Sequence, residues 1–201
     1  MSREAPKTNR DRTAATRAAL IDAGRRLFVE HGYAETSTPE VVRTAGVTRG
    51  ALYHHFADKR ELFLAVVEDE AKKVGEAIAD SSPPSGDPRA DLIAGCGAYL
   101  DAMAVPGRTR LMLIEGPSVL GAGRVREMDE AHAAGELRQG LAAAVPADSR
   151  GRFEMDALGD LLSAVFDRAA IAIDGGAGRT GYEATIIELI DRVIDRAHRP
   201  A

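Results

Sequence analysis

Apolar residues recur at every third or fourth position through most of the chain, the spacing that places them on one face of an α-helix. No segment shows the strict alternation of apolar and polar residues that is typical of a half-buried strand. Glycine and proline interrupt the helical pattern and divide it into about nine pieces. The interruptions lie at Gly32, at Gly46 and at residues 81–88, 105–107, 116–123, 145–151 and 175–181. The pattern therefore predicts an all-α protein.

Three helices are predicted near the N-terminus, and the second of them is very short. The first covers residues 13–31 and ends at Gly32. The second has Thr38 as its N-cap, since a proline follows at the first helical position, and it ends near Gly46. Thr48 caps the third helix after a bend in which Gly46 supplies the positive φ angle. Two helices joined by so short a bend form a helix-turn-helix.

The third helix has two different faces. Leu52 and Phe56 are four residues apart, and we expect both to point into the core. The opposite face carries Arg49, Gly50, Tyr53 and His54. The outward face is therefore basic, aromatic and able to form hydrogen bonds.

Longer helices are predicted in the rest of the chain. Asp58 and Glu61 have the spacing of a capping box, which opens a long helix ending near Asp80. The apolar stripes at 158–169 and 186–197 are wide enough to pack on each other and still leave apolar surface to bury. This surplus predicts a dimer.

The charge distribution changes the meaning of the net charge. A formal charge of −5 argues against a nucleic-acid partner, and the 45% hydrophobic and 28% charged residues are ordinary for a globular protein. Residues 1–64, however, contain 11 Lys and Arg against 8 Asp and Glu, whereas the rest of the chain contains 15 against 23. A basic segment thus coincides with the helix-turn-helix.

The absence of long apolar segments and the single cysteine indicate where the protein is located and whether it forms a disulfide. No apolar run approaches the roughly 18 residues of a membrane span, and residues 1–12 are polar, without the apolar region of a secretion signal. Cys96 is the only cysteine, so an intrachain disulfide is impossible. We therefore expect a cytoplasmic protein that does not act at a membrane.

The helix-turn-helix sequence resembles a known family. TPEVV at residues 38–42 and AGVTRGALYHHFADK at 45–59 are similar to the DNA-binding signature of TetR-type bacterial transcriptional regulators. The similarity covers residues 13–67, with Arg43 as one departure from the pattern. It implies a flexible arm at 1–12, a three-helix DNA-binding domain at 13–57, and a larger helical domain for ligand binding and dimerisation at 58–201.

The resemblance also implies roles in DNA binding. Tyr53 and Lys59 would contact phosphates, while Arg49 would bond to a guanine and Ala51 would meet a thymine methyl group. A solvated surface arginine is the open alternative for Arg49. The full implied set is Thr38, Thr48, Arg49, Gly50, Ala51, Tyr53, His54, His55 and Lys59. Two further arginines at positions 10 and 12 either add nonspecific affinity or lie in a frayed tail.

A ligand pocket is implied among the helices of the C-terminal domain. Its candidate residues are Cys96, Tyr99, Met103, Leu111, Met112, Phe153, Leu161, Val165 and Phe166. Plain core packing is the alternative for each of them. Residues 116–118 (Gly-Pro-Ser) form either a bend at the pocket wall or a simple turn between helices. With 4% aromatic residues and no tryptophan, a compact aliphatic pocket is favoured over an aromatic cage for a cation.

No motif for catalysis, a cofactor or a metal is present. His54 and His55 are adjacent and so lie on different helix faces, and His132 with Glu136 is typical of a surface pair. The sequence lacks a phosphate-binding glycine loop and a nucleophile elbow. We therefore expect no enzyme. The resemblance implies a homodimeric repressor that an unidentified small molecule releases from a palindromic operator. The alternative is a DNA-bound scaffold that recruits a protein partner.

Overall fold

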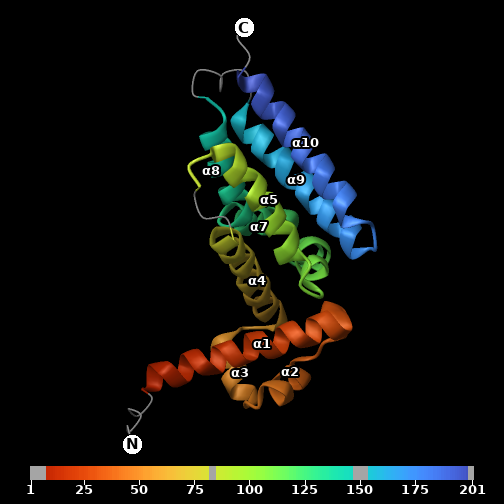
Figure 1. The fold of residues 1–201 in the computed structure, drawn as a ribbon. Helices are drawn as coiled ribbons and strands as arrows, with labels where there is room; N and C mark the ends of the chain where they lie inside the picture. The colour runs from red at the N-terminus through yellow and green to blue at the C-terminus, as the bar shows by residue number, and fades with distance from the viewer. Residues whose placement is uncertain (1–7, 82–84, 147–153, 199–201) are drawn as a thin grey trace, which may run out of the picture. The chain divides into compact units, whose positions relative to one another are not determined.

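The computed structural model describes residues 8–81, 85–146 and 154–198 (Figure 1). These residues form ten α-helices and one π-helical turn, and none of them lies in a strand. The all-α prediction is confirmed. The chain divides into two compact units, Met1–Asp69 and Glu70–Ala201, and the division falls inside the fourth helix.

The first unit contains three helices and the beginning of a fourth. These are α1 (Asn9–Glu35), α2 (Thr38–Ala45), α3 (Arg49–His55) and α4 (Lys59–Ser81). Phe28 of α1 and Phe63 of α4 are fully buried, and their rings meet edge to face at 5.1 Å. Leu52 and Phe56 are also buried, as their spacing predicted. A Cβ atom at Gly24 would lie 3.3 Å from Val66, so this glycine allows α1 and α4 to approach closely.

Helix α1 is longer than predicted. The Thr8 side chain accepts a hydrogen bond from the Asp11 N–H, and Asp11 accepts one from the Thr8 N–H, so a capping box starts the helix at Asn9. Arg10 and Arg12 therefore lie in its first turns. Toward the other end, Gly32 has a φ angle of 81°, outside the helical region, so the regular helix is interrupted at the residue where its end was predicted, and a short helical segment follows up to Glu35. The seven residues before Thr8, part of the predicted arm, lie outside the described residues.

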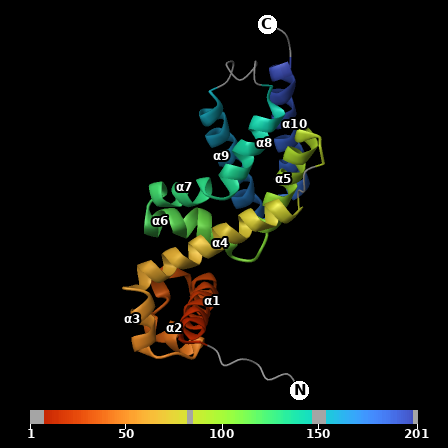
Figure 2. The same ribbon diagram turned by 90° about the vertical axis from the view of Figure 1, so that its left-hand side faces the viewer.

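The second unit is built from the remainder of α4 and seven further elements. They are α5 (Pro88–Met103), η1 (Arg110–Glu115), α6 (Gly116–Leu120), α7 (Ala122–Glu130), α8 (Ala133–Ala144), α9 (Met155–Asp174) and α10 (Arg179–His198). Helices α9 and α10 lie side by side (Figure 1), as do α6 and α7 (Figure 2). The core of this unit is formed mainly by α5, α8, α9 and α10, with Leu141, Leu162 and Ile190 among its buried residues.

The described residues form one more α-helix than the sequence pattern predicts, because the helical pattern around residues 108–144 is interrupted at different positions. Residues 116–118, predicted as a bend or turn, form the start of α6, and they do not line the cavity described below. The π-helical turn η1 runs directly into α6. The segment after residue 123 is divided into α7 and α8 at Ala131 and His132, a break that neither glycine nor proline marks.

A buried ion pair joins α4 to the segment between α5 and η1. Glu70 is fully buried, and its Oε2 accepts a hydrogen bond from Arg108 Nε at 2.8 Å. Arg108 also donates from Nη1 to the carbonyl oxygen of Ala102 at 2.6 Å. Lys73 Nζ lies 3.1 Å from the other carboxylate oxygen of Glu70. These hydrogen bonds and the attraction between the two charges offset part of the free-energy cost of removing Glu70 and Arg108 from water.

Candidate functional site

The start of α2 differs by one residue from the prediction. The Ser37 side chain accepts the N–H of Glu40 at 3.4 Å, so Ser37 is the N-cap. Thr38, the predicted cap, is the first residue of the helix. Serine and threonine are both good capping residues, so two adjacent ones leave the sequence ambiguous. Because Ser37 caps the helix, the Thr38 hydroxyl is available for a contact with another side chain on the surface of the unit.

The bend between α2 and α3 is formed as predicted. Gly46 has a φ angle of 66°, in the left-handed region, and its N–H donates to carbonyls in the last turn of α2. The N–H of Val47 also donates to the Val42 carbonyl, at 3.1 Å. Thr48 is confirmed as the N-cap of α3, since its hydroxyl accepts the Ala51 N–H at 3.1 Å. The bend fixes which face of α3 is exposed.

The exposed face of α3 brings together a basic, an aromatic and a hydroxyl side chain. The Tyr53 side chain is 43% exposed, and the guanidinium carbon of Arg49 lies 5.5 Å from the centre of its ring. Hydrogen bonds with the Thr38 side chain, and then with Arg49, lower the pKa of Tyr53. The structure thus places Thr38 of α2 beside Arg49 and Tyr53 of α3.

Gly50 lies on the same face, and nothing in its own chain crowds it. A Cβ atom at this position would lie 3.9 Å from the Thr48 hydroxyl oxygen, which is an ordinary van der Waals contact. Gly50 also has no positive φ angle that would require glycine. Neither packing nor backbone geometry within the chain therefore requires a glycine at this position.

The two adjacent histidines have different surroundings. His54 is exposed, whereas His55 is half-buried, and their ring centres are 5.3 Å apart. Burial lowers the pKa of His55, and the positive charges of His54 and Arg17 lower it further. His55 is therefore a poorer source of positive charge than an exposed histidine. Its contact with DNA stays a prediction.

Lys59 has a role within the fold that the sequence did not suggest. Its Nζ donates to the carbonyl oxygens of Tyr33 at 2.8 Å, Ala34 at 3.2 Å and Thr36 at 3.0 Å. The ammonium also lies 4.4 Å from the centre of the Tyr33 ring. Because an ammonium has three N–H donors, a direct hydrogen bond to a phosphate would require one of these bonds to open. The predicted phosphate contact is compatible with the charge of Lys59 but competes with its role as a cap for the end of α1.

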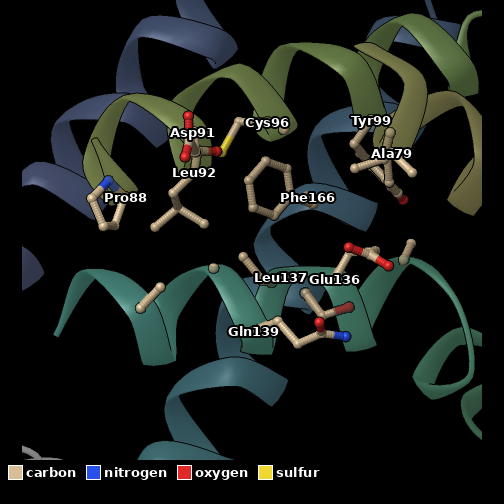
Figure 3. Close-up of a pocket in the computed structure, with 16 residues that line it drawn as sticks. Ala79, Pro88, Asp91, Leu92, Cys96, Tyr99, Glu136, Leu137, Gln139 and Phe166 are labelled. Carbon is tan, nitrogen blue, oxygen red and sulfur yellow. The ribbon is translucent and has the colours of Figure 1, made fainter. Parts of the chain in front are cut away.

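The second unit contains a cavity of about 400 Å³ between the end of α4 and helices α5, α8 and α9 (Figure 3). Three of the predicted pocket residues line it, namely Cys96, Tyr99 and Phe166. The wall also contains residues that were not predicted to line a pocket, among them Asp91, Leu92, Glu136, Leu137 and Gln139. A volume of this size is typical of sites that enclose small molecules.

The other predicted pocket residues lie elsewhere. Met103 and Leu111 are buried without lining the cavity, and Met112 and Val165 pack against the core. Leu161 is 66% exposed on the surface of α9. It lies at the edge of the apolar stripe predicted at residues 158–169. Phe153 lies outside the described residues. The apolar periodicity of the sequence thus identifies the apolar face of each helix. It does not show which residues of that face lie in the core, on the surface or in the cavity wall.

Two half-buried carboxylates lie next to the cavity wall. The Tyr99 hydroxyl donates to Asp167 Oδ1 at 2.6 Å, and the Ser163 hydroxyl donates to Asp129 Oδ2 at 3.0 Å. Burial is the main cause that raises the pKa of Asp167 to about 6, and burial also raises the pKa of Asp129. Tyr99 and Ser163 are themselves lining residues. The polar part of the wall is thus backed by negative charge.

Cys96 is a packing residue of the same wall. Its thiol donates to the Leu92 carbonyl at 3.1 Å, and burial raises its pKa to about 12. The thiol therefore stays protonated at neutral pH and is a poor nucleophile. Among the described residues, no group of three or more His, Cys, Asp or Glu is placed to hold a metal ion. No described helix combines the length and the apolar character needed to cross a membrane.

Comparison with known proteins identifies both units. Residues 20–66 match the family model of bacterial regulatory proteins of the tetR family, and residues 90–197 match the tetracyclin repressor-like C-terminal domain. The repressor AcnR of Corynebacterium diphtheriae is 34% identical over 76 residues, 38% of this chain and 40% of that protein. The regulator AcrR of Shigella flexneri is 35% identical over 99 residues, 49% of this chain and 46% of that protein. These matches cover less than half the length of either relative.

A solved structure extends the likeness over almost the whole chain. A TetR-family transcriptional regulator from Pectobacterium atrosepticum is 29% identical, with a TM-score of 0.68, and the match covers 97% of this chain and all of that one. The proteins named in these comparisons are transcriptional regulators rather than enzymes, in agreement with the sequence-based expectation. The C-terminal family match alone covers more than half of the chain. The chain belongs to the TetR family of bacterial regulatory proteins.

Proposed function

We propose that this protein is a DNA-binding transcriptional regulator that acts in the cytoplasm as a homodimeric repressor. The observation that carries the proposal is the exposed face of α3, where Arg49, Gly50 and Tyr53 follow a bend that holds the helix on the surface. An exposed helix of this kind fits the major groove of B-DNA. A small molecule in the cavity of the second unit would release the operator.

Each residue of the face has a role that suits its geometry. Arg49 can bond to the O6 and N7 atoms of a guanine, and Tyr53, with its phenol exposed, can donate to a phosphate. Ala51 can meet a thymine methyl group, and His54 is exposed for a base or phosphate contact. Thr38 would act through Tyr53, with which it forms a hydrogen bond.

A second copy of the chain is the partner that supports operator binding. Leu161 of α9 and Leu189 of α10 are 66% and 41% exposed, respectively. These two helices contact each other, so their exposed leucines would add to the apolar surface that a second copy could cover. Two copies would place two α3 helices in successive major grooves of a palindromic operator, about 34–36 Å apart.

Selection from a pool of randomised duplexes tests the DNA-binding proposal. We expect one palindromic sequence to be enriched and bound more tightly than random duplex at two salt concentrations. Arg49→Ala should cost about 1–3 kcal/mol on that sequence and relax specificity at one base pair of each half-site. Arg124→Ala, which removes an exposed arginine from α7, is the matched control and should bind as the wild type does. Failure to enrich any sequence would contradict the proposal.

Gly50→Ala is expected to change DNA affinity and folding stability in opposite directions. The new Cβ atom meets nothing in the chain at close range, and alanine has the higher helix propensity, so the free energy of unfolding should rise by up to about 1 kcal/mol. Affinity for the selected duplex should nevertheless fall, because the methyl group lies where the helix surface meets DNA. Chemical denaturation and fluorescence anisotropy measure the two quantities. Unchanged affinity would place Gly50 outside the interface.

Leu161→Glu tests the dimer. A charge buried in an apolar interface is strongly unfavourable, so if Leu161 lies in the proposed interface, sedimentation equilibrium should show a monomer at concentrations where the wild type is dimeric. Ala122→Glu introduces the same charge on an exposed position of α7 and should leave the dimer intact. A dimeric Leu161→Glu variant would rule out this face of α9 as the interface.

A further inference from the structure

The charged groups that line the cavity are all of one sign. Asp91 of α5 and Glu136 of α8 are lining residues, and none of the 16 lining residues is lysine, arginine or histidine. Figure 3 shows Glu136 extending from α8 toward Tyr99 of α5. The carboxylates therefore give the cavity a negative potential that favours a positively charged occupant.

The nearest arginines on the same helices are engaged elsewhere. Arg138 of α8 pairs with Glu130 at 3.0 Å and with Asp156 at 3.2 Å. Arg89 of α5 pairs with Asp191 and Asp195 of α10, at 2.8 and 3.3 Å. Asp91 Oδ1 accepts the backbone N–H of Ser85 at 2.8 Å, which is a neutral donor. The described ion pairs thus leave the negative charge of the cavity in place.

The hydroxyl groups of the wall are oriented as acceptors. Tyr99 and Ser163 donate their hydroxyl protons to Asp167 and Asp129, so each hydroxyl oxygen presents only lone pairs to a ligand. Burial raises the pKa of both aspartates, although the charge of Arg138 partly offsets this rise at Asp129. A ligand that donates hydrogen bonds and carries positive charge would satisfy this end of the cavity.

The rest of the wall is apolar. Leu92 and Phe166 lie between the α5 and α8 sides of the cavity in Figure 3, and Ile78 and Leu137 complete an aliphatic surface. Glu136 lies at the Tyr99 end of the wall, whereas Asp91 lies beside Leu92 and Cys96 (Figure 3). A ligand that matches the Glu136 end and the apolar surface has one charged end and an apolar body.

We propose that this cavity binds an amphiphilic organic cation, with its ammonium group between Glu136 and the Tyr99 hydroxyl and its apolar body against Leu92 and Phe166. The inference deepens the proposed function, since it assigns a chemical class to the small molecule that would release the operator. Carboxylates rather than an aromatic cage supply the attraction. Asp91 lies farther along α5 and adds a weaker, longer-range contribution.

Three ligands with the same eight-carbon chain test the assignment by isothermal titration of the full chain at pH 7.5. These are octylammonium, which is protonated at this pH as a lysine side chain is, octan-1-ol and octanoate. We expect octylammonium to bind about tenfold more tightly than octan-1-ol, and octanoate to bind most weakly. Octanoate binding as tightly as octylammonium, or no measurable binding of any of the three, would overturn the assignment.

Charge-neutral variants locate the ammonium group. Glu136→Gln should weaken octylammonium binding about tenfold, and Asp91→Asn about threefold, while both leave the affinity for octan-1-ol within about twofold. Asp174→Asn removes an exposed carboxylate at the end of α9 and should change neither affinity. An equal loss of both ligands in Glu136→Gln would indicate a damaged cavity wall and would contradict a direct contact with the ammonium.

The effect on DNA is measured separately, so the two proposals can fail independently. Octylammonium is added to the complex with the selected duplex, and release is followed by anisotropy. Binding with the expected ligand order but without release would keep the cation site and contradict ligand-controlled repression. Release by all three ligands alike would contradict the cation site and leave ligand control standing.

Discussion

Replacing Arg108 with methionine is expected to lower the free energy of unfolding by about 3–5 kcal/mol, because it leaves the carboxylate of Glu70 buried without its main partner. Lys73 also contacts Glu70, but its side chain is 46% exposed and forms a weaker, more solvated pair. The variant also removes the hydrogen bond to the Ala102 carbonyl. Urea denaturation followed by circular dichroism measures the change.

Two further variants show whether the loss comes from the uncompensated charge. Combining Arg108→Met with Glu70→Gln removes that charge and should recover part of the stability, as measured by a double-mutant cycle. Arg124→Met breaks an exposed pair with Glu127 and should cost less than about 1 kcal/mol. An Arg108→Met variant as stable as Arg124→Met would show that the Glu70–Arg108 pair contributes little in solution.

Asp167→Asn is expected to stabilise the protein at neutral pH and not at pH 4. The pKa of Asp167 is about 6 in the folded chain, against an ordinary value of 3.8, so the unfolded chain gives up this proton first as the pH rises. Stability therefore falls between about pH 4 and pH 6 and stays lower above that range. The difference between the two pKa values corresponds to about 3 kcal/mol, and solvent access reduces the expected gain to about 2 kcal/mol.

Urea denaturation of this variant at pH 4, 5, 6 and 7.5 tests both the size and the sign of the effect. Asparagine keeps an oxygen that can accept the Tyr99 hydroxyl, so the packing of the wall should be maintained. Asp174→Asn, at an exposed position, should show no such pH-dependent gain. A gain of the same size at every pH would show that relief of a buried charge is not its cause.

Local features of the first unit were predictable because they depend on neighbouring residues. The Gly46 bend, the Thr48 cap and the inward direction of Leu52 follow from backbone and capping preferences within one or two turns. The one-residue error at the start of α2 arose because Ser37 and Thr38 have similar capping preferences. Local preferences are therefore enough to predict which face of α3 is exposed.

Long-range contacts were not predictable from one sequence. Lys59 binds carbonyl groups 23 to 26 residues away, and Arg108 lies 38 residues from Glu70, so neither pairing has a periodic signal. The cavity wall combines Asp91 and Glu136 from two helices that only the tertiary fold brings together. A helical stripe also cannot distinguish a residue facing a cavity, such as Phe166, from one facing solvent, such as Leu161.

The open surroundings of Gly50 have a consequence for how such a protein can evolve. Arg49, Gly50 and His54 are exposed, and a new side chain at Gly50 meets no close neighbour in its own chain. Most destabilising substitutions act through buried or strained positions, and these three positions are neither. Mutation can therefore sample many side chains on this face at little cost in folding. Under the proposed function, a duplicated gene could thus acquire a new operator without first acquiring a more stable protein.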